Sequence, residues 1–349
     1  MNIFISKYGI MFVMFFFISC SKTSINKKQF PFTQKLEAEF IKIEEIIKFE
    51  NIYKLNDFVI IRDGNSNNEY FFYVYKYPEF DFLYAFAPKG NGAEEYLMPT
   101  VIKSTQNNLF LFRDHATDRF VTYEITDSLS LLINKFDFRP TDDRFMWEIN
   151  CMNDSLYLLK RSNNKWCRRE LWNYSSFSIV DSIPNTFDLV KNMGKDYYTT
   201  FDDCWIISSG DKFAFGYFFI DRIEFGSIKN NKIEIEKSIG ENSPPDFYLY
   251  KKNVVKGKYK YNVDNNIVYY ESMCSGYENV YALFSGIPWG DNEKMHSSCI
   301  EIYSWDGTPK TLVELDKSIS HFIVDEEAKA IYGFDISNTE DVIYKYTYR

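Results

Sequence analysis

The sequence predicts an all-β fold, a six-bladed β-propeller of four-stranded antiparallel blades. Aromatic residues form 19% of the chain, and aromatic residues favour strands. In the C-terminal region the apolar residues recur with the period of two that half-buried strands show. Groups of short strands also return along the chain at a spacing near that of a propeller blade, typically about 40 to 50 residues. A β-sandwich or a pair of small barrels is the competing architecture, and the repeated spacing favours the propeller.

The strand pattern is clearest between Cys299 and Arg349. Two short strands flank Asp306-Gly307, a pair expected to supply the positive φ angles of a two-residue type I′ turn. Ile319–Val324 and Ile331–Phe334, separated by a polar turn, predict a second hairpin. The pattern contains no helical stripe, so this region is interpreted as one antiparallel blade followed by the next.

Six successive units can be counted along the chain. Their expected bounds are Phe58–Ala87, Leu109–Phe136, Arg144–Ile183, Phe201–Ile239, Asn266–Leu315 and Ile319–Tyr348. An aromatic or apolar residue near the end of each third strand serves as a marker of the repeat. The markers are Tyr75, Tyr123, Leu171, Phe225, Tyr303 and Tyr346, at spacings of 48, 48, 54, 78 and 43 residues. The spacing of 78 is attributed to insertions at Ser243–Lys260 and Gly286–His296. We expect these insertions to carry any binding, because loops on a rigid scaffold commonly do.

The sixth unit supplies only three strands, so its fourth strand is expected from another part of the chain. Lys35–Ile43 has the pattern of a strand that precedes the first unit. We expect it to pair with Val342–Tyr348, because closing a ring with strands from both termini protects sheet edges. An amphipathic helix is the alternative, since a 3.6-residue period is also fitted by Leu36, Phe40, Ile43 and Ile47.

Residues 1–19 are predicted to be a lipoprotein signal peptide. Lys7 provides a positive charge, and the apolar run Tyr8–Ile18 is too short to cross about 30 Å of hydrocarbon as a helix. Phe17-Ile-Ser-Cys20 resembles a bacterial lipobox with phenylalanine in place of the usual leucine. That resemblance implies cleavage before Cys20 and acylation of its sulfur. An ordinary secretory signal with an incidental cysteine is the alternative.

The remaining chain divides into a short tether and one domain. Residues 20–33 are the expected lipidated cysteine and polar tether, and residues 34–349 the propeller domain. Acyl chains on Cys20 would make a membrane the first partner of the protein. The cell envelope is therefore the predicted location, on the inner or the outer membrane. No acidic export tag follows Cys20, which favours the periplasmic side over the cell surface. We expect a monomer.

Charge and cysteine content exclude several classes of protein. The net charge is −9 and the basic residues are scattered, which argues against nucleic-acid binding and against a polybasic membrane patch. The mature chain keeps five further cysteines, an odd number: Cys151, Cys167, Cys204, Cys274 and Cys299. They show no metal-ligand spacing. We predict buried thiols, with disulfides as the alternative, and no cofactor or metal.

Several segments together resemble a known family. APKGNGAEEYLMP at Ala87–Pro99, YSWDGTP at Tyr303–Pro309 and HFIVDEEAKAIYGF at His321–Phe334, with the lipobox and the six-unit spacing, resemble the TolB-like six-bladed β-propeller lipoproteins of the Bacteroides group. The resemblance covers roughly residues 34–349. Where that family usually has a GxGPxEF-like loop, Gly90-Asn-Gly92 is followed here by Ala93. The resemblance implies the fold and the location, and it supplies no mechanism.

Paired carboxylates are the main candidates for chemistry. Asp202-Asp203 and Asp142-Asp143 precede expected inner strands, and Glu148, Glu271 and His321 lie on inner strands of other blades. Inner strands line the central channel, where hydrolases place carboxylates or a calcium ion. A solvated channel mouth or loop caps are the structural alternative, which we favour. The three histidines show no local ligand spacing, so a zinc site or a Ser-His-Asp triad has no support in the sequence.

Aromatic residues in the insertions are the candidates for recognition. Tyr248 and Trp289 are placed to stack on a sugar ring or to anchor a protein partner, and packing between blades is the alternative. The expected ligand-binding residues are Asp202, Asp203, Glu271, His321, Tyr248 and Trp289. The sequence thus favours a non-enzymatic envelope binding module for a protein or a glycan. The alternative is an envelope hydrolase or lyase that uses channel carboxylates, with or without calcium.

Overall fold

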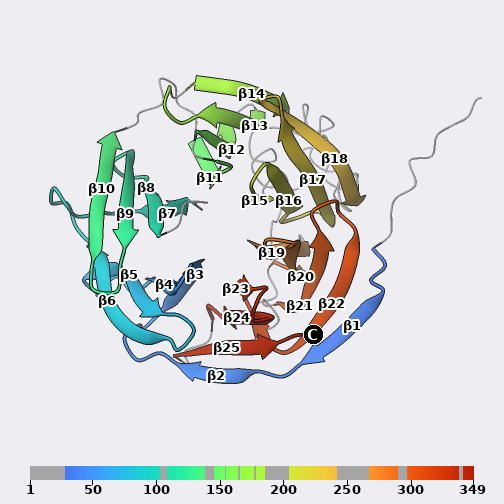
Figure 1. Ribbon diagram of the computed structural model, residues 1–349, viewed down its shortest axis with the longest axis horizontal. Coiled ribbons are helices and arrows are strands. Elements are labelled where there is room, and N and C mark those ends of the chain that lie inside the picture. The colour runs from blue at the N-terminus through green and yellow to red at the C-terminus, as the bar shows by residue number, and fades with distance from the viewer. Residues whose placement is uncertain are drawn as a thin grey trace, which may run out of the picture.

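The chain forms a ring of six β-sheets around a central axis (Figure 1). The computed structural model describes residues 28–102, 108–137, 145–153, 155–163, 166–176, 178–184, 204–241, 267–289, 297–337 and 341–349. Each sheet is one blade, whose strands follow one another from the axis to the rim. The predicted six-bladed, all-β propeller is confirmed. Over the described ranges, no helix is long and apolar enough to cross a membrane.

Four blades are each built from four consecutive strands. Blade 1 contains β3 (Phe49–Leu55), β4 (Phe58–Asp63), β5 (Tyr70–Lys76) and β6 (Asp81–Pro88). Blade 2 contains β7 (Pro99–Ile102), β8 (Leu109–Asp114), β9 (Arg119–Ile125) and β10 (Ser130–Asp137). Blade 3 contains β11 (Phe145–Cys151), β12 (Leu156–Asn163), β13 (Trp166–Asn173) and β14 (Ser178–Pro184). Blade 4 contains β15 (Cys204–Ser209), β16 (Lys212–Tyr217), β17 (Arg222–Lys229) and β18 (Lys232–Gly240).

The other two blades each include a strand from the N-terminal part of the chain. Blade 5 contains β19 (Ile267–Ser275), β20 (Asn279–Pro288), β21 (Ser297–Ser304) and β22 (Pro309–Ile319), with β1 (Phe32–Leu36) as a fifth strand at its outer edge. Blade 6 contains β23 (His321–Asp325), β24 (Ala330–Phe334) and β25 (Val342–Thr347), with β2 (Glu39–Lys42) at its outer edge.

The core is divided among the six seams between neighbouring blades. A cluster of buried apolar side chains fills each seam. The six marker residues all lie in the third strands of their blades and are all buried: Tyr75, Tyr123, Leu171, Phe225, Tyr303 and Tyr346. Across the seam of blades 4 and 5, for example, the ring centroids of Phe225 and Tyr303 are 5.6 Å apart. Both faces of a blade pack on neighbours, which explains the large aromatic content of the strands.

The hairpin at Asp306-Gly307 differs from the predicted type I′ turn. Of these two residues only Gly307 has a positive φ, of 72°. Its N–H donates to Ser304 O at 2.8 Å, and the Ser304 N–H donates to Thr308 O at 3.0 Å. This geometry is a type I turn followed by a glycine bulge, the usual three-residue hairpin loop. The Asp306 carboxylate accepts hydrogen bonds from Ser304 Oγ and the Thr308 N–H. Asp306 itself keeps a negative φ angle.

The ring is closed by the N-terminal segment, as the sequence predicts, but with two short strands on two blades instead of one strand on one blade. Residues 28–48 form a strap along the rim, in which β1 pairs parallel with β22 and β2 pairs antiparallel with β25. Strand pairing excludes the helical alternative. Leu36 therefore belongs to blade 5, and only Glu39–Lys42 pairs with β25. β22 is already the fourth strand of blade 5, so β1 adds a fifth strand there, whereas β2 supplies the missing fourth strand of blade 6.

Burial is uneven along the strap. Phe40 is exposed, and Leu36 is half-buried. Ile43 and Ile46, just after β2, are buried instead and pack into the seam between blades 6 and 1. The apolar anchor of the closing segment therefore lies at its C-terminal end.

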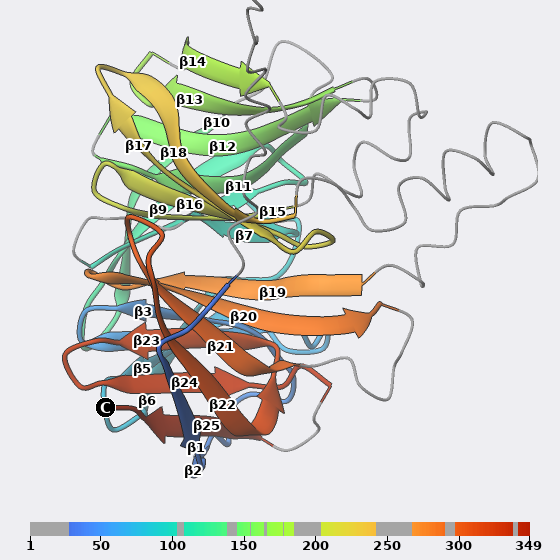
Figure 2. The ribbon, with the colours of Figure 1, turned by 90° about the vertical axis from the view of Figure 1, so that its right-hand side faces the viewer.

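Connections leave the ring at two opposite faces (Figure 2). The short-turn face has tight turns between first and second strands and between third and fourth strands, such as Asn56-Asp57 and Asn230-Asn231. At the other face, β20 ends beside the start of β19, with Pro288 paired to Ile267. We call this the insertion face. Of the predicted insertions, residues 286–289 are described, and Ser243–Lys260 with residues 290–296 lies outside the described residues.

The four cysteines whose side chains are described differ in burial. Cys151 and Cys204 are buried, and Cys274 and Cys299 are half-buried. Cys299 is a free thiol, and burial raises its pKa to about 12. The Cys299 thiol is thus unreactive at neutral pH. The side chain of Cys167 lies outside the described residues.

Candidate functional site

A cavity of about 380 Å³ lies among the six inner strands of the ring. Every blade contributes to its wall, and one lining residue from each inner strand in chain order is Asn51, Thr100, Glu148, Trp205, Ser272 and His321. Inner strands face the axis on one edge, so a propeller brings residues from all parts of the chain to one place. The volume falls within the usual range for small-molecule sites, about 300 to 1,000 Å³.

The cationic side chains of this channel lie close to acidic partners. Arg62 Nε lies 3.1 Å from Glu50 Oε2, and Lys54 Nζ lies 3.3 Å from Asp325 Oδ2. The Lys54 ammonium also lies 4.7 Å from the ring centroid of Tyr77, a favourable cation–π geometry. These pairings reduce the positive charge that the wall presents, so the channel offers polar contacts without a strong field of one sign.

Two aromatic or imidazole rings in the wall are held in defined positions. Trp205 Nε1 donates to Tyr270 O at 2.9 Å, which fixes the indole against blade 5. The imidazole of His321 stacks on Phe334 with ring centroids 5.7 Å apart, and its Nδ1 lies 3.2 Å from Ser320 Oγ. Rings fixed in this way present a rigid surface to a ligand at a low entropic cost.

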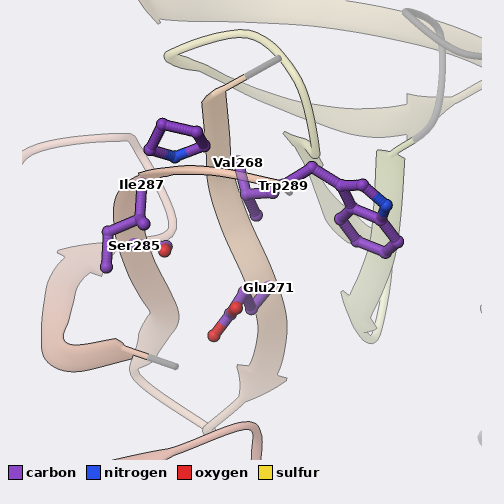
Figure 3. Close-up of a pocket in the computed structure, with 6 residues that line it drawn as sticks. Val268, Glu271, Ser285, Ile287 and Trp289 are labelled. Atoms are coloured by element: carbon purple, nitrogen blue, oxygen red, sulfur yellow. The ribbon is translucent and has the colours of Figure 1, made fainter. Parts of the chain in front are cut away.

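Glu271 lies outside the channel wall, in a separate pocket of blade 5 (Figure 3). Two irregularities in the pairing of β19 and β20 create this pocket: Glu271 is an extra residue on β19 between Tyr270 and Ser272, and β20 has an extra residue between Phe284 and Ile287. A β-bulge redirects the side chain of the extra residue. The pocket has a volume of about 10 Å³, enough for a water molecule.

The carboxyl group of Glu271 is largely removed from water. The pKa of the Glu271 carboxyl group is raised to about 8. Burial is the main cause and the charge of Asp335 adds to it, whereas the hydrogen bond from the Ser297 N–H acts in the opposite direction. The Ser297 N–H donates to Glu271 Oε2 at 3.1 Å. Figure 3 shows Val268 and Ile287 beside the carboxyl group. Glu271 is therefore mostly protonated at neutral pH.

Trp289 lies at the edge of the same pocket and is partly used for packing. Its indole meets Phe218 and Phe219 of blade 4 edge-on, with centroids 5.2 and 6.0 Å apart. It remains 38% exposed. The alternative of packing between blades thus applies to much of this side chain, while one part stays open to solvent.

The structure separates the predicted site residues that it describes. His321 lies in the channel wall, whereas Glu271 and Trp289 line the small pocket. Asp202, Asp203 and Tyr248, like Asp142 and Asp143, lie outside the described residues. A ligand role for any of them stays a prediction. In the described part of the chain, no group of three or more His, Cys, Asp or Glu side chains is placed to hold a metal ion.

The sequence reasoning missed most of the channel wall. Thr100 lies on β7, a strand of only four residues, and it has no distinctive sequence signal. Trp205 follows Cys204 at the start of an inner strand. Alternation does not mark the channel wall, because consecutive residues of one inner strand, such as Ser272–Ser275, line the cavity. The position of Trp205 on the innermost strand of its blade was the signal that could have found it.

Solved structures with the same fold come from several sources. A Bacteroides fragilis protein described as exported is 16% identical, with 90% of this chain and 98% of that chain covered and a TM-score of 0.57. A member of the DUF4221 family from Bacteroides vulgatus is 9% identical, with 90% and 97% covered and a TM-score of 0.54. The β-propeller domain of Cps50 (Swd1) from Myceliophteria thermophila is 8% identical, with 89% and 100% covered and a TM-score of 0.51. These likenesses show the fold alone.

Comparison of the sequence itself gives a more specific result. No curated protein matches the chain. The family model described as TolB-like 6-blade propeller-like matches residues 34–327, which is most of the chain and includes strands of every blade. This chain therefore belongs to the TolB-like six-bladed propeller family.

Proposed function

We propose that the protein is a lipid-anchored binding module of the cell envelope, which holds part of a protein or glycan ligand in its central channel. The cavity of about 380 Å³ among the inner strands is the observation that carries this proposal. Its wall combines the fixed rings of Trp205 and His321 with polar groups such as Asn51 and Ser272. Ring faces beside hydrogen-bonding groups suit a sugar unit or a short peptide segment.

Location in the envelope is part of the same proposal. The lipobox-like Phe17–Cys20 supports it, and so does the likeness in fold to a Bacteroides protein described as exported. We propose that the ring acts as a monomer, because one chain supplies the strands of all six blades. The periplasmic side remains the proposed side.

The second candidate function is that of a hydrolase or a lyase acting on an envelope substrate. Glu148, a carboxyl group in the channel wall, favours it, because a carboxyl group beside a bound substrate can act as a general acid or base. Such a reaction needs a second carboxylate about 5 to 9 Å away. Loss of any turnover of envelope glycans in Glu148→Gln, with binding retained, would support this candidate.

Replacing Cys20 by alanine is expected to move the protein from the membrane to the soluble fraction. The acyl chains are the proposed attachment, since each buried CH₂ contributes about 0.8 kcal/mol to membrane binding. The measurement is detergent phase separation of cells that express each form. Ser21→Ala is the matched control and should stay in the detergent phase. Membrane partition of Cys20→Ala equal to the wild type would contradict lipid anchoring.

Filling the channel is expected to abolish ligand capture. Thr100 lines the cavity and is exposed to it, so Thr100→Trp adds bulk there without disturbing a seam. Thr308→Trp, in an exposed turn at the rim, adds the same bulk elsewhere. The soluble protein is applied to a glycan array, and the immobilised protein is incubated with solubilised envelope. The bound glycans and the captured proteins are quantified. The glycans or proteins bound by both the wild type and Thr308→Trp should be lost with Thr100→Trp. Equal capture by all three forms would refute the channel as the binding site.

A further inference from the structure

The first residue of the strap is fixed in the seam between blades 4 and 5. Lys28 is only 12% exposed, its Nζ contacts the carboxylate of Asp221, and it lies 3.3 Å from Glu301 Oε1. The ammonium also lies 4.8 and 4.6 Å from the ring centroids of Tyr270 and Phe284. Carboxylates and ring faces from two blades therefore surround one cation, which makes its position well defined.

Further contacts hold the strap along its length. Phe30 meets Tyr303 edge-on, with ring centroids 5.3 Å apart. The side chain of Gln34 accepts a hydrogen bond from the Arg349 N–H at 3.1 Å and donates to Arg349 O at 3.3 Å. The Ala38 N–H donates to Asp316 Oδ1 at 3.0 Å. The point at which the chain joins the ring is thus a fixed place on blades 4 and 5.

The outer side of the strap carries exposed apolar side chains. Phe32, Phe40 and Ile47 are 68%, 58% and 66% exposed. Both phenylalanines lie on β1 and β2, the outermost strands of blades 5 and 6 (Figure 1). The strap contains four lysines and four glutamates and so has no net charge. Exposed aromatic side chains on a strap without net charge are suited to the interface of a lipid bilayer, where amphipathic and aromatic groups gather.

We propose that the rim of blades 5 and 6 rests on the bilayer, with Phe32, Phe40 and Ile47 in the headgroup region. The proposal rests on the lipidation of Cys20. Eight residue steps join Cys20 to Lys28, and because an extended chain spans at most about 3.6 Å per residue, the anchor lies within about 29 Å of Lys28. The tether therefore keeps the start of the strap near the membrane, and the exposed apolar side chains of the strap favour the rim of blades 5 and 6 as the part that meets it.

The orientation has a consequence for the channel. Blade 2 lies across the ring from blade 5 (Figure 1), so the rim of blade 2 faces away from the bilayer. A ring that rests on its rim has its axis parallel to the membrane plane. Both faces of the channel are then open to ligands that diffuse along the membrane surface.

Lipid crosslinking tests the orientation directly. The full chain is purified from its own membranes in detergent, placed in vesicles that contain a photoactivatable phosphatidylcholine, and illuminated, and crosslinked residues are mapped by mass spectrometry. Crosslinks are expected on the strap and on neighbouring β22 and β25. The outer strand β10 is an internal control, because Leu131, Leu132 and Ile133 on it are also exposed and apolar. Since the strap has no net charge, the pattern should not change with anionic lipid or with high salt.

Variants separate the apolar contact from the tether. Phe32→Ser with Phe40→Ser should reduce crosslinking of the strap several-fold, whereas Leu131→Ser with Ile133→Ser should leave it unchanged. Crosslinks on β10 equal to or above those on the strap would overturn the proposal, and so would crosslinks spread evenly around the rim.

A protein found in the soluble fraction would instead show that lipidation had failed. In that case a chain that begins at Ser21, with an N-terminal hexahistidine tag on nickel-chelating lipid, restores an anchor at the same place. The same crosslink pattern is expected from this tethered chain, and a pattern on β10 would again overturn the orientation. The two failures are therefore distinguishable.

Discussion

A chain that begins at Phe49 is expected to melt on the order of 10 °C below a chain that begins at Lys28, or to aggregate. Removing residues 28–48 uncovers the outer edges of β22 and β25. It also removes Ile43 and Ile46, each 1% exposed, and a fully buried side chain of this size contributes roughly 1.5 to 3 kcal/mol. Their joint contribution, about 3 to 6 kcal/mol, is a large part of a typical stability of about 5 to 15 kcal/mol.

Point variants of the intact chain show which contacts matter. Ile43→Ala with Ile46→Ala should reproduce much of the loss in melting temperature, because both side chains fill the seam between blades 6 and 1. Phe40→Ser should have little effect, since Phe40 is exposed and such surface changes usually alter stability by less than about 0.5 kcal/mol. Thermal unfolding is followed by circular dichroism. Superimposable melting curves for the chains beginning at Lys28 and Phe49 would refute a stabilising role for the strap.

Glu271→Gln is expected to stabilise the protein at pH 9 and to change its stability little at pH 4. In the folded protein the pKa of Glu271 is about 8, and its ordinary value is 4.5. Between these values the unfolded chain has released a proton that the native chain keeps, so the stability of the wild type falls as the pH rises, by about 1.4 kcal/mol per pH unit. The difference from the variant stops growing above the folded pKa and reaches at most about 5 kcal/mol.

Urea unfolding of both proteins at pH 4, 6, 7.5 and 9 measures this effect. Glutamine has nearly the same shape and cannot ionise, so its curve lacks the fall that Glu271 causes. Asp335→Asn is the second variant: the charge of Asp335 raises the pKa of Glu271, so its removal should move the end of the fall to lower pH. If the free energies of unfolding of the wild type and Glu271→Gln stayed parallel from pH 4 to pH 9, the raised pKa would be wrong.

The sequence by itself determined the number of blades and the place of most strands. The six marker residues could be found because both faces of every blade are buried, so each third strand must contain a large apolar residue at a similar place. Closure by the N-terminal segment also followed from the sequence, since three strands in the last unit leave one open edge. These features depend on strand periodicity and spacing, which are local properties of the chain.

The tertiary structure alone decided which side chains meet. Glu271 was expected in the channel, but one extra residue at a bulge is enough to turn a side chain to another face. Trp205 and Thr100 share the channel wall only because separate blades converge on one axis. Lys28 and Glu301 are 273 residues apart in the chain, and nothing near either residue indicates the other. Such contacts depend on how six blades pack around a ring, which the period of any one strand does not contain.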